Sequence, residues 1–254
     1  MHTIVFGDDR SAGSDVAWLW INDQQWPGWR VDVVTVPETE LGPPHVLGST
    51  ELTAWEPDDP RTVFPGSGIE DVRHLTADAD PRVVLCSRED ADLLVVGATG
   101  RGLLKRWLHV GSTTEWLLHQ PPAPLLVARA ARPVRSVLVA VDGSDPARRA
   151  LEAFVSLPWA ASTHVLALGV YDGWAEPEQG LADAASVLEA AGISHRTEQV
   201  RGRATETLLE RMRADQAQLI VLGARGRSTL HRAMAGSTAS AVTRAADGNV
   251  LVVA

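Results

Sequence analysis

The sequence has little of what disulfide-linked, membrane-bound and nucleic-acid-binding proteins need. Its single cysteine, Cys86, cannot form a disulfide within the chain, so we expect a reducing compartment, the cytoplasm. No apolar run approaches the roughly 20 residues of a membrane-spanning helix, and a strand-like segment rather than a signal peptide follows Met1. The net charge of -9 opposes binding to nucleic acid or to a membrane surface, because both need a basic face.

Lysine is nearly absent as well, which argues against two kinds of phosphate chemistry. The only lysine, Lys105, is not part of a Gly-Lys-Ser or Gly-Lys-Thr sequence, so the chain has no Walker-type P-loop. The adjacent acids Asp8 and Asp9 are similar to the acidic pocket of a phosphoaccepting receiver domain, but that pocket also needs a lysine beyond a later acceptor aspartate. Lys105 lies inside a glycine-rich loop instead, so the sequence does not favour a receiver domain.

What the chain does have is a glycine-rich segment in two copies. The segment 223–238 reads GARGRSTLHRAMAGST, and the segment 97–113 reads GATGRGLLKRWLHVGST, with ten residues rather than nine between its second and third glycines. Each copy follows a short apolar run typical of a buried parallel strand. The segments 5–11 and 139–144 also correspond, so the chain contains two versions of one domain.

The 254 residues therefore divide into two tandem domains, 1–132 and 133–254. Strands and helices are predicted to alternate in both, which indicates an α/β fold with a parallel sheet and helices on both faces. The expected strands are 3–7, 31–36, 69–75, 93–96, 125–128, 137–141, 164–171, 195–200, 219–222 and 250–253. The expected helices include 14–24, 80–90, 178–191 and 204–214.

The two domains differ between their second and third strands. Residues 178–191 have the apolar periodicity of a helix, whereas residues 37–68 contain six prolines and no such period. We therefore predict that a loop replaces this helix in the first domain. So long a loop is typical of a lid, an interface or a disordered stretch, and Trp55 within it suggests docking.

Each glycine segment joins a strand end to a helix start, an arrangement that suits a bound anion. Free backbone N–H groups and the positive end of a helix dipole meet there, and glycine lets the ligand approach the backbone. If the first and fourth strands are neighbours, Asp142 and Ser144 face Gly223 and Gly226. They then lie across the crevice in which doubly wound sheets bind ligands.

A purely structural reading stands beside this one. The glycines can simply form turns, and Ser237 can simply cap its helix. Residues 112–115 fit a helix-capping box, whether or not Ser112 also binds a phosphate. Arg225, Arg227 and His231 can balance phosphate charge or be solvated.

Together these motifs resemble the universal stress protein family, and the duplication resembles its tandem form. The resemblance covers Val-Asp-Gly-Ser at 141–144, the glycine signature at 223–237 and the order of strands and helices. It implies a Rossmann-like, doubly wound sheet of five strands in each domain, which binds ATP, with or without Mg²⁺, as a non-catalytic stress-response regulator. The implied nucleotide-binding residues of the second domain are Val141, Asp142, Ser144, Val170, Gly223, Arg225, Gly226, Arg227, Gly236, Ser237 and Thr238. Their counterparts in the first domain are Asp8, Asp9, Val36, Gly97, Gly100, Arg101, Gly111, Ser112 and Thr113.

The first domain departs from the family pattern. Its first motif lacks the glycine, its second helix is missing, and its glycine loop has one extra residue. That residue can displace the third glycine by up to about 3.5 Å, so we expect the second domain to be the better site. The alternative function is an interaction module of the same fold that holds no nucleotide. An enzyme or a metal site is not expected, beyond slow ATP hydrolysis, because no His-Glu-x-x-His or Gly-x-Ser-x-Gly motif is present.

The last strand of each domain, 125–128 and 250–253, is apolar and expected at a sheet edge. Exposed edges invite pairing. We therefore predict that the two domains pair through these strands as an intrachain pseudo-dimer. A homodimer of two chains is a further option, and the sequence indicates no particular protein partner.

Overall fold

Strands and helices alternate through the computed structural model, which describes residues 1–36, 49–100, 111–119, 121–171, 173, 177–224 and 236–254. No helix in these ranges is both long and apolar enough to cross a membrane. The first domain contains β1 (His2–Gly7), α1 (Ala12–Asn22), β2 (Trp29–Thr35), β3 (Ser49–Ala54), β4 (Ile69–Asp78), α2 (Pro81–Cys86), β5 (Leu93–Gly97), α3 (Ser112–His119) and β6 (Leu125–Ala128). The second contains β7 (Ser136–Val141), α4 (Asp145–Val155), a 3₁₀ turn (Ala160–Ser162), β8 (His164–Tyr171), α5 (Glu178–Ala190), β9 (Ser194–Arg201), α6 (Ala204–Ala214), β10 (Leu219–Gly223), α7 (Ser237–Ala245) and β11 (Asn249–Val253).

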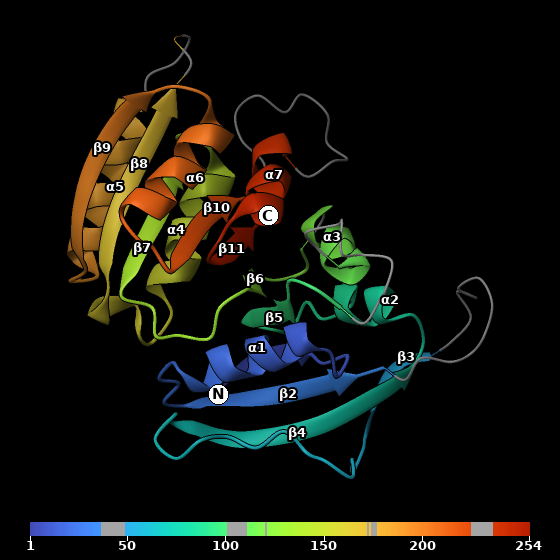
Figure 1. Cartoon of the computed structure of the whole chain (residues 1–254). Coiled ribbons are helices and arrows are strands. Elements are labelled where there is room, and N and C mark those ends of the chain that lie inside the picture. The colour runs from blue at the N-terminus through green and yellow to red at the C-terminus, as the bar shows by residue number, and fades with distance from the viewer. Residues whose placement is uncertain (37–48, 101–110, 120, 172, 174–176, 225–235) are drawn as a thin grey trace.

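One eleven-stranded sheet runs through both domains in the order β3-β4-β2-β1-β5-β6-β11-β10-β7-β8-β9 (Figure 1). In the first domain β1 lies between β2 and β5, and in the second β7 lies between β8 and β10, with all of these pairs parallel. The winding of the sheet reverses at β1 and β7, so a ligand crevice is expected at the carboxyl end of each. The predicted pairing of the terminal strands is confirmed: β6 and β11 pair antiparallel, with Leu126 opposite Leu251.

Helices cover both faces of the sheet, and each face has one core that continues from domain to domain. The helices α1, α4 and α5 pack on one face, and α2, α3, α6 and α7 pack on the other. Alternate residues of each strand point to opposite faces, so Phe6 of β1 faces the first core and Val5 the second. An aromatic cluster crosses the domain boundary, because the ring of Trp159 lies 6.1 Å from the rings of both Trp20 and Trp26.

Side-chain caps explain where several helices begin. Ser11 Oγ accepts a hydrogen bond from the backbone N–H of Ser14 at 3.2 Å, and Ser144 Oγ accepts one from Ala147 at 3.3 Å. Asp80 caps α2 as predicted, with proline at the first helical position. The helix ends at Cys86 rather than near residue 90, since the Ser87 hydroxyl donates to the Val84 carbonyl at 2.8 Å and so competes with the helical ladder.

The predicted loop 37–68 is wrong in one respect, because its described part, 49–68, begins with a strand. This strand, β3, pairs antiparallel with β4 at the edge of the sheet. Residues 55–68, here called the strap, then lie against α1, on the face that α5 covers in the second domain. Prolines in this segment have no backbone N–H to donate. The strap is held by hydrogen bonds with polar groups of α1 and of the turn that follows α1. Trp18 Nε1 donates to Thr62 O (3.1 Å), Asn22 Oδ1 accepts from Phe64 N (2.6 Å), and Trp26 N donates to Ser67 O (2.7 Å).

Polar contacts join the domains where β6 meets β11. Asn249 is fully buried, and its Oδ1 accepts hydrogen bonds from the backbone N–H groups of Arg129 at 2.8 Å and Ala130 at 3.1 Å. The Arg129 guanidinium donates to the Thr243 carbonyl in the last turn of α7, where the helix dipole favours a cation. Arg244 of α7 forms an ion pair with Glu115 of α3. The linker between β6 and β7 is thus fixed to the second domain.

Candidate functional site

A cavity of about 270 Å³ lies at the carboxyl ends of β1 and β5 in the first domain. This is the position at which a doubly wound sheet binds its ligand. One part of its lining is apolar and comes from strand ends and α2: Val34, Val36, Pro81, Leu85 and Val96. The other part is polar or glycine: Gly7, Asp8, Asp9, Gly97, Thr99, Gly100, Gly111, Ser112, Thr113 and Thr114. The cavity therefore combines an apolar end with a backbone-rich polar end.

The turn after β1 has the same backbone in both domains although only one copy contains glycine. Asp9 Oδ1 accepts a hydrogen bond from Ser11 N at 3.1 Å, and Asp142 Oδ1 accepts one from Ser144 N at 2.9 Å. Arg10 takes the place of the glycine with a φ of 57°, which matches the 72° of Gly143. The left-handed region costs a residue with a side chain about 1–2 kcal/mol. The missing glycine therefore strains the first motif without changing its shape.

The first glycine of each glycine segment is needed for packing. A Cβ atom on Gly97 would lie 2.4 Å from the carbonyl carbon of Gly13 in α1, and one on Gly223 would lie 2.7 Å from the backbone nitrogen of Ala147 in α4. Both glycines let the first helix of their domain approach the strand end. Gly97 also lines the cavity, so the structural and ligand-facing roles coexist there.

The expected displacement of the third glycine is wrong. Gly111 N donates to Ala98 O at 2.8 Å, and Gly236 N donates to Ala224 O at 2.7 Å, so both glycines hold the same place relative to their strand. The extra residue of the first loop therefore does not displace Gly111, and residues 101–110 lie outside the described ranges. One of the three departures that favoured the second domain as the better site is thereby removed.

The helix after each glycine segment begins at its serine. Ser112 and Ser237 are the first residues of α3 and α7, so Gly111 and Gly236 hold the cap positions. The predicted capping box at 112–115 and the capping role of Ser237 are therefore wrong. Backbone N–H groups in a first helical turn have no partner within the helix. In α3 they lie beside the cavity, together with the hydroxyl groups of Ser112 and Thr113.

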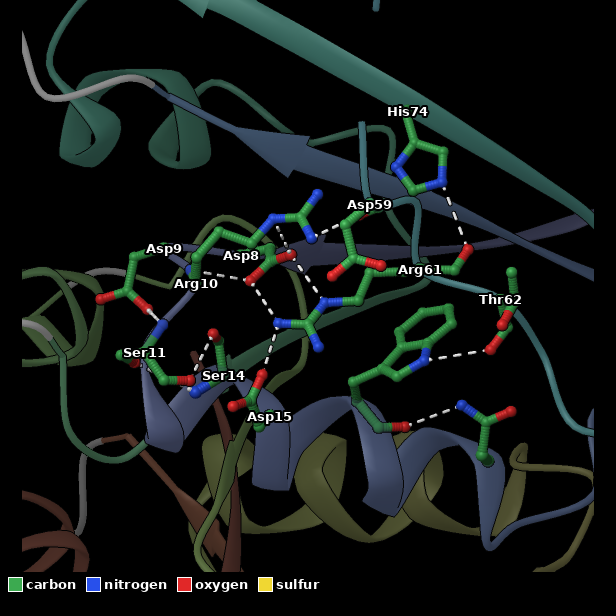
Figure 2. Close-up of polar contacts among 12 residues, drawn as sticks. Asp8, Asp9, Arg10, Ser11, Ser14, Asp15, Asp59, Arg61, Thr62 and His74 are labelled. Atoms are coloured by element: carbon green, nitrogen blue, oxygen red, sulfur yellow. Dashed lines mark hydrogen bonds and ion pairs between the residues drawn. The ribbon is translucent and has the colours of Figure 1, made fainter. Parts of the chain in front are cut away.

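A buried ion cluster lies against the cavity wall (Figure 2). The Asp8 side chain is fully buried, and Arg61 of the strap donates to both of its oxygens, at 2.8 and 2.9 Å. Arg10 Nε lies 3.1 Å from Asp8 Oδ2, and Arg61 Nη2 lies 2.7 Å from Asp15 on α1. Burial alone would raise the pKa of Asp8, but the hydrogen bonds from Arg61 and the Arg10 backbone, with the charge of Arg61, hold it below the usual value.

Replacing Arg61 by methionine should destabilise the protein by about 3–5 kcal/mol at pH 7, since a buried charge loses its main partner. The lowered folded-state pKa means that Asp8 stabilises the native state above its unfolded pKa of about 4, and that this contribution is lost as pH falls through the folded value. In Arg61→Met the effect of burial on the Asp8 pKa is no longer opposed by Arg61. Asp8 then takes up a proton as the pH falls, and this removes the buried charge that destabilises the variant. The difference from wild type should therefore shrink between pH 7 and pH 4 in urea titrations.

Arg73→Met provides the matched control for this measurement. Arg73 pairs with Asp71 at 2.8 Å, but both side chains are almost half exposed, and an exposed pair contributes about 0–1 kcal/mol. A loss in Arg61→Met that is no larger than in Arg73→Met, or that stays the same at both pH values, would contradict the prediction.

The structure brings most of the predicted first-domain site residues to one cavity. Eight of them line it: Asp8, Asp9, Val36, Gly97, Gly100, Gly111, Ser112 and Thr113. In the second domain Asp142 and Ser144 follow β7, Val141 ends it, Val170 lies near the end of β8, Gly223 ends β10, and Gly236, Ser237 and Thr238 begin α7. Arg101, Arg225, Gly226, Arg227 and His231 lie outside the described residues.

Sequence reasoning missed the apolar end of the cavity and the Arg61 ion pair. Leu85 had a local signal, because it lies on the buried side of a helix that starts at the strand ends. Arg61 had none, since it meets Asp8 across 53 residues of chain.

Comparisons with known proteins agree on one family. A sequence profile described as the universal stress protein family matches residues 1–129 and 133–254. A universal stress protein of Mycobacterium tuberculosis is 27% identical over 292 residues, a match that covers 99% of this chain and 96% of that protein. A universal stress protein of Synechocystis is 28% identical over 158 residues, and the match covers 61% of this chain and only 55% of that relative.

The fold is also found among solved structures. A crystal structure of a universal stress protein from Archaeoglobus fulgidus has a TM-score of 0.68 with this chain, at 19% sequence identity. The match covers 99% of this chain and 95% of that one. At this identity the likeness shows the tandem α/β architecture alone.

Proposed function

The chain belongs to the universal stress protein family, and we propose that it is a non-catalytic member that binds ATP in its first-domain cavity and acts as a stress-response regulator. The observation that carries this proposal is one cavity, of about 270 Å³, that joins an apolar pocket to the N-terminus of α3 at the point where the sheet reverses its winding. Such a cavity matches a ligand that is apolar at one end and anionic at the other.

The residues present fit the parts of ATP. Val34, Val36 and Leu85 offer an apolar slot for the adenine ring. The polar end offers the N–H groups of the first turn of α3, which have no partner within the helix, and there a helix dipole favours phosphate. Glycine at position 100 leaves room for Asp9 beside the cavity, because a Cβ there would lie 2.8 Å from Asp9 Oδ2. Asp9 is exposed at the cavity and is the proposed partner of the ribose hydroxyls.

The second domain offers the same framework, and we propose a second ATP site there. Its turn after β7 and its third glycine repeat the hydrogen bonds of the first domain. The proposed ligand groups are Asp142, Ser144, the Val170 backbone, Gly223, Arg225, Gly226, Arg227, Gly236, Ser237 and Thr238. Gly143, which follows Asp142, has no side chain, so this turn forms without the strain found at Arg10.

We propose binding rather than turnover because of the chemistry of the described lining. Among the described residues its ionisable side chains are Asp8 and Asp9, and Asp8 is held in ion pairs with Arg10 and Arg61. Three or four hydrogen bonds to phosphate at about 1.5–3 kcal/mol each, with adenine burial, are enough for the roughly 8 kcal/mol of a micromolar site. We propose that any hydrolysis is slower than about 1 per second, the low end of ordinary enzymes.

The test is a mass spectrum of small molecules released on denaturing the purified protein, followed by calorimetric titration of the emptied protein with ATP. We expect an adenine nucleotide in the released fraction and saturable binding with a micromolar dissociation constant. A protein that releases no adenine compound and takes up none would refute the proposal and leave the alternative, a nucleotide-free interaction module of the same fold.

A further inference from the structure

The turn after β1 lies between the cavity, which Asp8 and Asp9 line, and the strap, which Asp8 and Arg10 contact. Asp9 lines the cavity, close to Gly100. Asp8 is bonded to Arg61 of the strap through both of its oxygens, and Arg10 also contacts the strap. Figure 2 shows Asp9 directed away from Arg61, on the opposite side of the turn from the ion cluster. A movement of the strap must therefore act on both chain neighbours of Asp9.

The strap supports the strained conformation of Arg10. A φ of 57° is rare for a residue with a side chain. Four contacts with described residues hold it: Arg10 N donates to Asp8 Oδ1 at 2.9 Å, Arg10 Nε lies 3.1 Å from Asp8 Oδ2, Arg10 Nη1 donates to the Asp59 carbonyl at 2.6 Å, and the guanidinium lies 6.0 Å from the centre of the Trp55 ring. Asp59 and Trp55 belong to the strap, and Asp8 is itself fixed by Arg61.

The second domain builds the same turn with valine and glycine in place of Asp8 and Arg10. Gly143 adopts its φ of 72° without a side chain, and Val141 stands where the first domain has Asp8. The N-terminal turn of α5 packs directly on it, since a Cβ on Gly180 would lie 2.8 Å from the Cα of Gly143. The strap thus stands where the second domain has α5. Ion pairs of Arg61 with Asp8 and Asp15 are found there in place of the backbone packing of Gly180 on Gly143.

We propose that Arg61 is a positioning residue for the first-domain cavity, and that through it the strap sets the affinity of that cavity for nucleotide. Arg61 connects the strap to the end of β1 through Asp8 and to α1 through Asp15, so it holds the turn that places Asp9. The inference rests on the proposed function, because it requires a nucleotide in this cavity. Linkage is reciprocal, so a bound nucleotide must also stabilise the strap.

Hydrogen exchange on the full-length protein tests the coupling without any substitution. Saturating ATP should slow amide exchange in residues 93–100, which end at the cavity, and also in the strap. If ATP leaves exchange in 93–100 unchanged, the proposed function fails for this cavity and the inference fails with it. If 93–100 are protected while the strap is not, the inference alone is overturned.

Substitutions test whether Arg61 acts through the turn. Arg61→Gln should weaken ATP binding in the first domain by about 10-fold, whereas Arg73→Gln, which breaks only an exposed pair, should leave it unchanged. The triple variant Arg61→Gln, Arg10→Gly and Asp8→Val should recover most of the loss, since it gives this turn the residues of the second domain, where glycine adopts the left-handed turn unaided and no buried carboxylate is left without its cations. An Arg61→Gln protein that binds as wild type does, or a triple variant that binds as weakly as Arg61→Gln, would overturn the inference.

Discussion

Replacement of Gly100 by valine should lower the affinity of the first domain for ATP by about 100-fold or more. A Cβ atom at this position would lie 2.8 Å from Asp9 Oδ2, so Asp9 must leave its place and the two valine methyl groups must enter the cavity. Loss of two hydrogen bonds to phosphate, at about 1.5–3 kcal/mol each, is sufficient for this effect. The second-domain site should bind as before, so calorimetry should lose one class of sites.

The fold should survive this change. Gly100 is exposed and its φ is not left-handed, and the atom in its way is the end of a side chain that can rotate. The control is Ala182→Val, which adds the same two methyl groups on the exposed side of α5. Unaltered ATP affinity in Gly100→Val, with the melting temperature of wild type, would place the nucleotide outside this cavity.

Replacement of Trp159 by alanine should reduce the free energy of unfolding by about 3–5 kcal/mol, the usual cost of emptying a buried aromatic site. Trp159 is 5% exposed, and its ring contacts Phe154 in its own domain and Trp20 and Trp26 in the other. The cavity would therefore open at the boundary between the domains. Urea titration followed by circular dichroism measures the loss without relying on tryptophan emission.

Trp116→Ala is the matched control, since Trp116 on α3 is 53% exposed. We expect a loss of less than about 1 kcal/mol there. Trp159→Phe should lie between the two, because it keeps a ring in the cluster and removes an indole N–H that has no hydrogen-bond partner among the described residues. Equal losses at positions 116 and 159 would show that the aromatic cluster does not stabilise the domain boundary.

The elements that follow from local pattern were predictable. Apolar runs and helical periodicity located nearly every strand and helix to within a few residues, and the repeat indicated which strands would be neighbours. The pairing of β6 with β11 was predictable for the same reason, because two apolar strands at sheet edges bury each other.

Features that depend on tertiary contact were not predictable. The strand β3 contains Ser49, Thr50 and Glu51, and its exposed sequence carries no apolar alternation; it forms by pairing with the edge of β4 opposite β2. The left-handed Arg10 looked like a lost motif, yet a hydrogen bond to the carbonyl of Asp59, 49 residues away, helps to preserve its shape. Likewise the longer glycine loop suggested a displaced Gly111, although a single hydrogen bond keeps that residue in place.

The ion pair that joins α3 to α7, near the pairing of β6 with β11, has no symmetric counterpart, because the two domains differ at the corresponding positions. Glu115 of α3 pairs with Arg244 of α7, but Ser240 holds the position of Glu115 in the second domain and His119 holds that of Arg244 in the first. Two copies of the second domain would set serine against arginine, and two copies of the first would set glutamate against histidine. Each domain is therefore matched to its unlike neighbour, and the polypeptide is in effect a heterodimer joined by a peptide linker. Neither of the two proposed sites has to serve on both sides of a symmetric assembly, so the sequence of each can change without changing the other.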